Sequence, residues 1–138
     1  TVQYRIGALG FFQPINGTTN LGILDQVESL RWIRREAANF GGDPDNVCVF
    51  GLSSGGTCTA ALLGCPHAEG LFHKAIVLSA SPRTTTLAAV ATQRSALAEY
   101  MGWSDGESVT VERLNELTPA QLLEAQIQLN LRCALHWY

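Results

Sequence analysis

The sequence predicts an α/β fold in which parallel strands alternate with helices. Two short apolar runs, residues 47–50 and 74–79, have strand character, and residues 21–40 carry an amphipathic helical pattern. Strand-like and helix-like segments alternate over residues 1–79, which is typical of a right-handed, parallel α/β sheet. The full chain has 138 residues, which is the length of one ordinary domain.

The first two predicted elements are a strand and a long helix. Residues 2–6 have strand character, and Gly7 and Gly10 are expected to end that strand before a loop rich in turn formers. From residue 21 the apolar residues recur every three or four positions, so one stripe of a helix faces the core. The stripe consists of Leu24, Val27, Leu30, Ile33 and Ala37.

The next segments complete a strand, helix and strand. Residues 43–46 (DPDN) predict a plain turn, because the glycine and distal glutamate of a calcium loop are missing. Residues 47–50 are wholly apolar, which indicates a parallel strand buried on both faces. Residues 55–63 are rich in small side chains and predict a helix that lies close to the sheet, and residues 74–79 predict a third strand.

The remainder of the chain, residues 83–138, has helical character. We predict helices over residues 87–100, 111–117 and 119–131. The last begins with a capping-box pattern, in which Thr118 precedes Pro119 and is followed three positions later by Gln121.

Composition excludes several classes of partner. The net charge is −3 and no Lys/Arg cluster occurs, so neither nucleic acid nor an anionic membrane surface is an expected partner. No apolar run reaches the length of a membrane-spanning helix. The cysteines show no CxxC pair and no metal-ligand spacing with the three histidines, so no metal site is predicted. These cysteines are Cys48, Cys58, Cys65 and Cys133. Localisation and oligomeric state stay open.

The sequence Gly51-Leu52-Ser53-Ser54-Gly55 matches the pattern G-x-S-x-G. In a nucleophile elbow this pattern makes a sharp strand-to-helix turn, and the two glycines are expected to relieve collisions between strand and helix. The turn exposes the hydroxyl of Ser53, and the backbone N–H of Ser54 can donate to a developing oxyanion. The alternatives are a plain Gly/Ser turn and a phosphate-binding loop, although no lysine follows the glycines as in a P-loop.

Four ordered blocks surround and include this pattern: NLGILDQ (20–26), LRWIRREAANFGGDPDNV (30–47), FGLSSGG (50–56) and GLFHKAIVLSAS (70–81). Together they resemble the type-B carboxylesterases, the carboxylesterase/cholinesterase branch of the α/β-hydrolases. The resemblance is continuous over residues 1 to about 82 and implies that residues 1–138 are a single partial α/β-hydrolase domain. In that domain, residues 1–82 form the core with the elbow and residues 83–138 form a helical segment. The resemblance also implies a serine esterase that acts on a small-molecule ester without a metal or organic cofactor.

Carried over onto this sequence, the family's nucleophile is Ser53 and its oxyanion donor is the backbone N–H of Ser54. The family usually has Glu before the nucleophile and Ala after it, whereas this chain has Leu52 and Ser54. A glycine-rich oxyanion loop of the HGGG type is absent from the sequence, and the family's acid and histidine come far downstream of the serine. We therefore expect this chain alone to be inactive. The competing hypothesis is a non-catalytic, cholinesterase-like binding or adhesion domain.

A complete triad inside the chain is the remaining alternative. The order serine, acid, histidine is satisfied by a carboxylate followed by His136, but this histidine lies just past a helical segment. His67 and His73 come too soon after the elbow helix. A triad is decided by geometry, and these positions fit it poorly. The carboxylates considered are Asp105, Glu107 and Glu112.

Overall fold

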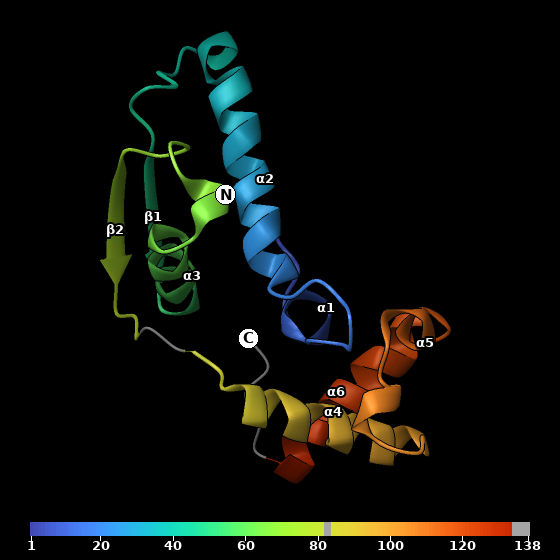
Figure 1. Ribbon diagram of the computed structural model, residues 1–138. Helices are drawn as coiled ribbons and strands as arrows, with labels where there is room; N and C mark the ends of the chain where they lie inside the picture. Colours follow the sequence, from blue (N-terminus) through green and yellow to red (C-terminus); the bar gives the residue numbers. More distant parts are fainter. Residues whose placement is uncertain (82–83, 134–138) are drawn as a thin grey trace. The chain divides into compact units, whose positions relative to one another are not determined.

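A computed structural model describes residues 1–81 and 84–133, and the chain divides into two compact units. The first unit comprises Thr1–Tyr4 and Gly22–Thr84, and the second comprises Arg5–Leu21 and Thr85–Tyr138. Figure 1 gives the course of the chain within each unit. Each unit has its own hydrophobic core.

The first unit contains a parallel sheet of two strands, β1 (Cys48–Leu52) and β2 (Lys74–Leu78). They are joined through α3 (Ser54–Leu63) and the short 3₁₀ turn η2 (Pro66–Ala68). The predicted parallel strand–helix–strand arrangement is therefore confirmed in this part of the chain. Strand β1 begins and ends later than the predicted 47–50, because its pairing with β2 continues to Leu52.

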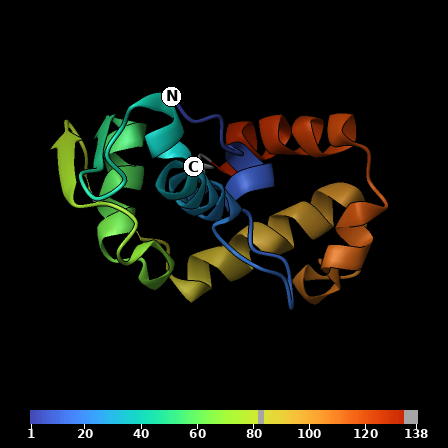
Figure 2. The ribbon, with the colours of Figure 1, turned by 90° about the horizontal axis from the view of Figure 1, so that it is seen from above.

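Helix α2 (Leu21–Glu36) confirms the long amphipathic helix and is followed by the 3₁₀ turn η1 (Ala37–Phe40). Helices α2 and α3 lie on the same side of the two strands (Figures 1 and 2). Val27 and Leu30 of the predicted stripe are buried there against Leu62 of α3, and Ile33 and Val49 pack around them. Burial of this apolar stripe, rather than helix propensity alone, stabilises α2.

The turn between η1 and β1 also agrees with the sequence prediction. The Asp43 carboxylate accepts a hydrogen bond from the N–H of Asp45 at 2.9 Å, and the Asp43 carbonyl accepts one from the N–H of Asn46 at 3.1 Å. This is the ordinary way in which an aspartate closes a turn.

The strand predicted for residues 2–6 is wrong. Residues 1–6 have no regular secondary structure, and within the described ranges the only sheet is the β1–β2 pair. A strand exists only where a neighbour accepts and donates its backbone hydrogen bonds, and the segment has no such neighbour there. Tyr4 is instead fixed by its side chain, because the Cys58 thiol of α3 lies 3.9 Å from the Tyr4 hydroxyl. Burial of this hydroxyl raises the pKa of Tyr4.

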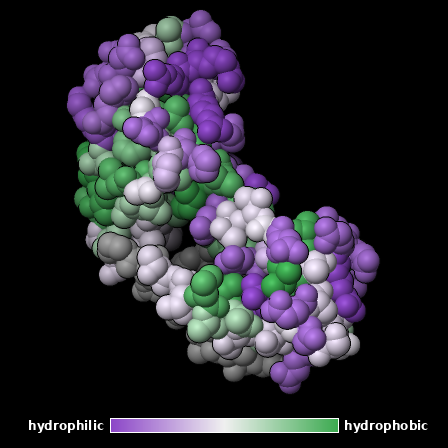
Figure 3. Space-filling view, viewed as in Figure 1, coloured by the Kyte–Doolittle hydropathy of each residue, from purple (hydrophilic) through white to green (hydrophobic). Residues whose placement is uncertain are grey.

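The prediction that β1 is buried on both faces is also wrong for this chain. One face of the sheet packs against α2 and α3, but the side chain of Phe50 on the other face is 74% exposed. The apolar side chains of β1 are thus covered on one face of the sheet only. Figure 3 shows the resulting apolar surface over β1 and β2.

The second unit is helical, as predicted for this part of the chain. It contains α4 (Leu87–Met101), the 3₁₀ turn η3 (Gly106–Ser108), α5 (Val111–Asn115) and α6 (Pro119–Cys133). The Arg113 guanidinium lies 4.5 Å from the centre of the Trp103 ring, which gives a cation–π contact. The core of this unit consists of Phe12, Leu97, Ala98, Val109, Ala125 and Leu129.

A short helix, α1 (Gly7–Phe11), occupies the position where the sequence predicted only a break and a loop. Gly7 has φ +58, and a Cβ placed on it would lie 2.1 Å from the side-chain oxygen of Gln126 in α6. The same oxygen accepts a hydrogen bond from the N–H of Ala8 at 2.6 Å. Glycine suits position 7 because of this positive φ, and because an added Cβ would displace the Gln126 side chain that accepts from Ala8.

The capping box predicted at Thr118 is confirmed. The Thr118 hydroxyl accepts from the N–H of Gln121 at 3.3 Å, and the Gln121 side-chain oxygen accepts from the N–H of Thr118 at 2.8 Å. Two backbone donors at the start of α6 are thereby satisfied.

We expect Thr118→Ala to lower the free energy of unfolding by about 1 kcal/mol, because it removes one half of this reciprocal cap. Thr92→Ala is the matched control. The Thr92 hydroxyl donates to the Ala88 carbonyl of its own helix at 3.1 Å, and losing such a bond within a helix changes stability little. Denaturant unfolding of the whole protein measures both variants. Equal stability of the two would contradict the role given to the cap.

Candidate active site

The candidate site lies at the carboxyl end of β1, where the strand turns directly into α3. Ser53 is the single residue between β1 and α3, with φ 55° and ψ −118°. Few non-glycine residues adopt such a conformation, and it costs on the order of 1–3 kcal/mol. Strained residues of this kind cluster at functional sites.

Three hydrogen bonds hold Ser53 in this conformation. Its N–H donates to the Leu78 carbonyl of β2 at 2.9 Å, which extends the sheet ladder past the end of β1. Its carbonyl accepts from the N–H of Thr57 at 2.9 Å and from the Thr57 hydroxyl at 3.3 Å. The Thr57 hydroxyl also lies 3.3 Å from the Ser81 carbonyl. The backbone of the turn is thus fixed by both the neighbouring strand and the helix that follows.

The hydroxyl of Ser53 is left available by this arrangement. Ser53 is exposed, and its side chain does not cap the helix that it precedes. Ser54 is also exposed and is the first residue of α3. In residues 1–81 and 84–133 the Ser54 N–H has no acceptor, as expected for the first turn of a helix. Since the helix dipole adds partial positive charge there, this N–H suits an incoming oxyanion.

The first glycine of the motif is required by backbone contact. A Cβ on Gly51 would lie 2.2 Å from the Gly55 carbonyl oxygen and 2.7 Å from the Gly56 nitrogen. Real Cβ atoms essentially never approach so closely. The start of α3 is therefore in direct backbone contact with the end of β1, as the motif predicted for Gly51.

The role predicted for Gly55 is wrong in its detail. A Cβ on Gly55 would meet nothing within 4 Å, whereas one on the next residue, Gly56, would lie 2.7 Å from the Leu78 carbonyl oxygen and 2.8 Å from the Cβ of Ala80. Gly55 presents its carbonyl to Gly51, and Gly56 is the glycine that lets α3 approach β2. The sequence contained the signal, two consecutive glycines, but gave no reason to choose the second.

Of the histidines predicted to be poor catalytic bases, His73 is poorly placed to serve Ser53. His73 directly precedes β2, and its Nδ1 accepts from the N–H of Val47 at 3.2 Å. It therefore lies at the amino end of the sheet, about 16 Å from the end that carries Ser53, given five residues at about 3.3 Å each. His67 is exposed in η2. His136 lies outside the described residues.

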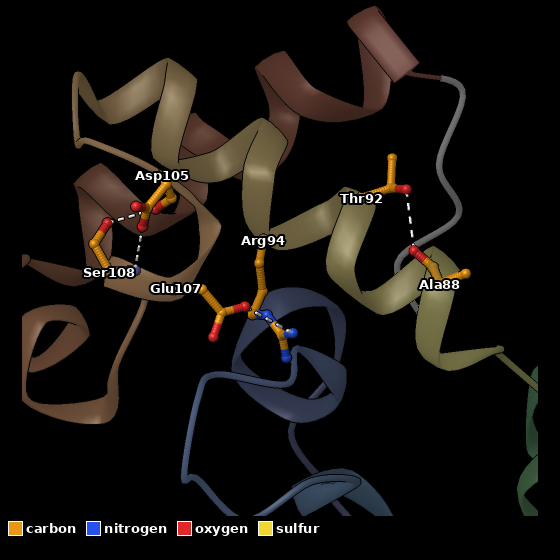
Figure 4. A network of polar contacts seen from close by, with 6 residues as sticks. All are labelled: Ala88, Thr92, Arg94, Asp105, Glu107 and Ser108. Atoms are coloured by element: carbon orange, nitrogen blue, oxygen red, sulfur yellow. Dashed lines mark hydrogen bonds and ion pairs between the residues drawn. The ribbon is translucent and has the colours of Figure 1, made fainter.

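The three carboxylates weighed for a triad have local partners in the second unit. The Asp105 carboxylate accepts from the N–H of Ser108 at 3.0 Å, and Glu107 lies 3.7 Å from Arg94 (Figure 4). Hydrogen bonds from its own backbone N–H and the Thr110 hydroxyl lower the pKa of Glu112. Asp105 and Glu112 therefore act at the starts of helical segments, and Glu107 forms an ion pair with Arg94. Over the described ranges no group of three or more His, Cys, Asp or Glu side chains is arranged to hold a metal ion.

The sequence from residue 1 to residue 137 matches the model of the carboxylesterase family. The chain belongs to this family. The match includes the helical segment and extends well past residue 82, where the continuous resemblance of the sequence blocks ended.

Similar proteins include two curated esterases. The chain is 41% identical over 135 residues to a para-nitrobenzyl esterase of Bacillus subtilis, and 39% identical over 138 residues to carboxylesterase 1D of Rattus norvegicus. In each comparison 95% of this chain is aligned, but it covers only 27% and 24% of the relative. The chain thus spans about a quarter of the length of the curated relatives that it matches.

Solved structures place the fold in the same group. A thermophilic PNB esterase superposes with a TM-score of 0.87 at 40% identity, covering 97% of this chain and 28% of that structure. The juvenile hormone esterase of Manduca sexta superposes with a TM-score of 0.83 at 31% identity, covering 93% of this chain and 26% of that structure. The fold is therefore that of part of an α/β-hydrolase, as the sequence predicted. No helix in the described part of the chain has both the length and the apolar character to cross a membrane.

We expect Gly51→Ala and Gly56→Ala each to destabilise the protein by about 3 kcal/mol, because the new methyl group would meet backbone atoms that cannot move aside. Gly55→Ala is the matched control, since its methyl group enters open space within a helix and should be neutral or stabilising by up to about 1 kcal/mol. Soluble yield and melting temperature of the three variants measure this. A Gly55→Ala variant as damaged as Gly51→Ala would contradict the geometry.

Proposed function

We propose that this chain carries the nucleophile of a serine carboxylesterase that hydrolyses small-molecule carboxylic esters. The observation that supports the proposal most directly is the conformation of Ser53, strained and exposed at the strand–helix turn. It occurs in a member of the carboxylesterase family and at the serine of a G-x-S-x-G pattern. We further propose that residues 1–138 form one partial α/β-hydrolase domain.

The proposed reaction has two steps. The Ser53 oxygen attacks the ester carbonyl carbon while a histidine base takes the hydroxyl proton. The tetrahedral intermediate collapses, and the alcohol leaves with that proton to give an acyl-enzyme. Water, deprotonated by the same histidine, then attacks the acyl carbon and releases the carboxylic acid and free Ser53. In both steps the Ser54 N–H donates to the oxyanion.

The histidine and its orienting carboxylate are proposed to come from outside residues 1–138. His73 lies at the opposite end of the sheet from Ser53, and the chain spans only about a quarter of the curated relatives. A serine without a base is a weak nucleophile. The chain alone is therefore proposed to hold a formed nucleophile turn that does not turn over substrate.

Fluorophosphonate labelling of the full-length protein tests the assignment of Ser53. We expect an adduct on Ser53 and a loss of esterase activity of at least about 10⁴-fold in Ser53→Ala. Ser54→Ala is the matched control and should stay within about 10-fold of the parent, because its contribution comes from a backbone N–H that alanine retains. An adduct on Ser54, or an unlabelled protein, would refute the assignment.

Residues 1–138 alone are expected to show no turnover of p-nitrophenyl esters and poor solubility. The proposed base lies outside this fragment, and the exposed apolar face of β1 and β2 favours aggregation. Gel filtration, thermal melting and an esterase assay on this fragment check both points. A monomeric, cooperatively melting fragment that hydrolyses the ester would overturn the proposal that its catalytic partners lie elsewhere.

The second candidate function is a non-catalytic, cholinesterase-like binding or adhesion domain. It is favoured by Leu52, an apolar residue where the family usually carries glutamate before the nucleophile. The same labelling experiment separates the two candidates, since a folded full-length protein without an adduct supports the binding domain.

A further inference from the structure

The last paired residues of the sheet are Leu52 of β1 and Leu78 of β2. Each is followed by a serine with positive φ, 55° at Ser53 and 49° at Ser79. Both strands therefore leave the sheet through a residue with positive φ at the same level. The Leu52–Leu78 pair is the final regular layer beneath the turn that carries Ser53.

The two leucines share the face of the sheet that points away from α2 and α3. Alternation along β1 places Leu52 on the same face as Phe50 and opposite to Val49, which packs in the core with the helices. Leu52 is 63% exposed and Leu78 is 47% exposed. Because they are register partners in adjacent strands about 4.8 Å apart, their side chains are direct cross-strand neighbours.

The backbone connects this pair to the nucleophile. The Leu78 carbonyl accepts the hydrogen bond from the Ser53 N–H at 2.9 Å, and the same carbonyl limits how closely Gly56 of α3 can approach. A shift of β2 relative to β1 at this level would change both the Ser53 hydrogen bond and the packing of α3 against β2. Leu52 and Leu78 are the paired side chains at this level on the face that the helices do not cover.

We propose that Leu52 and Leu78 form an apolar positioning pair that fixes the Ser53 turn, in a chain where no carboxylate precedes the nucleophile. The inference rests on the proposed esterase function and deepens it. One consequence is that truncating either leucine lowers kcat more than it raises KM.

The first test is a double-mutant cycle in the full-length protein with p-nitrophenyl acetate. We expect Leu52→Ala and Leu78→Ala each to lower kcat by about 10-fold or more with KM changed less than about 3-fold. The double variant should be no more than about 3-fold worse than either single one, because each substitution removes the same contact. Leu52→Met should recover most of kcat, since it restores the apolar volume.

Phe50→Ala is the matched control. Phe50 lies on the same strand and face, is 74% exposed, and pairs with Ile76 one layer farther from Ser53. Its kcat should stay within about 2-fold of the parent at a temperature below the melting point of every variant. A loss in Phe50→Ala equal to that in Leu52→Ala would show a general effect of the sheet face and overturn the inference.

The second test is the pH profile of kcat in Leu52→Glu. The new carboxylate faces the apolar Leu78, so we expect a lower kcat and an additional ionisation in the acid limb that the parent lacks. A pH profile that coincides with the parent's would overturn the inference. In the double-mutant cycle, two results would do the same: single variants whose kcat stays within 2-fold of the parent's, or a double variant whose loss of kcat equals the product of the two single losses. If the unmodified protein gives no fluorophosphonate adduct, the proposed function fails; if it labels normally and Leu52→Ala keeps full kcat, only the positioning pair fails.

Discussion

The first unit is organised around one backbone contact, between the end of β1 and the start of α3. Gly51 lies so close to the Gly55 carbonyl that a single added methyl group would be 2.2 Å from it. Strand and helix can therefore be joined by one residue, and that residue must take an unusual conformation to make the connection. Ser53 does so at φ 55°. The strain of on the order of 1–3 kcal/mol is offset by the Ser53 hydrogen bonds to β2 and α3 and by the packing of α3 through Leu62.

The chemistry available at the turn follows from the same contact. A single connecting residue leaves the Ser53 side chain outside both the sheet and the helix. It also brings the first unsatisfied N–H of α3 next to that side chain. The position of the nucleophile and one oxyanion donor is thus determined by the turn itself and by its contact with Leu78 of β2. Proton transfer is not, because a base must approach the hydroxyl from a different part of the fold, and His73 is held at the opposite end of the sheet.

The sequence predicted what depends on local pattern and missed what depends on distant neighbours. The stripe through Val27 and Leu30, the Thr118 cap and the G-x-S-x-G turn are each set within a few residues, and all three are found. The strand predicted at residues 2–6 is not found. Its local sequence has strand character but carries no information on whether a neighbouring strand is available to pair with it. The same limit applies to β1, whose apolar sequence is compatible with burial on both faces although only one is covered here.

The sequence prediction assigned a close contact to Gly55, whereas the structure assigns it to Gly56. The sequence alone could not have distinguished these two glycines. Gly55 and Gly56 are adjacent and both lie in the first turn of α3, so the G-x-S-x-G pattern alone favours Gly55. The contact that requires glycine at position 56 is made with Leu78 and Ala80, more than twenty residues later, and depends on the parallel register of β1 and β2. That register also places Leu52 beside Leu78. Under the proposed positioning role, a substitution at Leu78 would act on Ser53 through the carbonyl that accepts the Ser53 N–H. The five residues of the motif do not contain that contact.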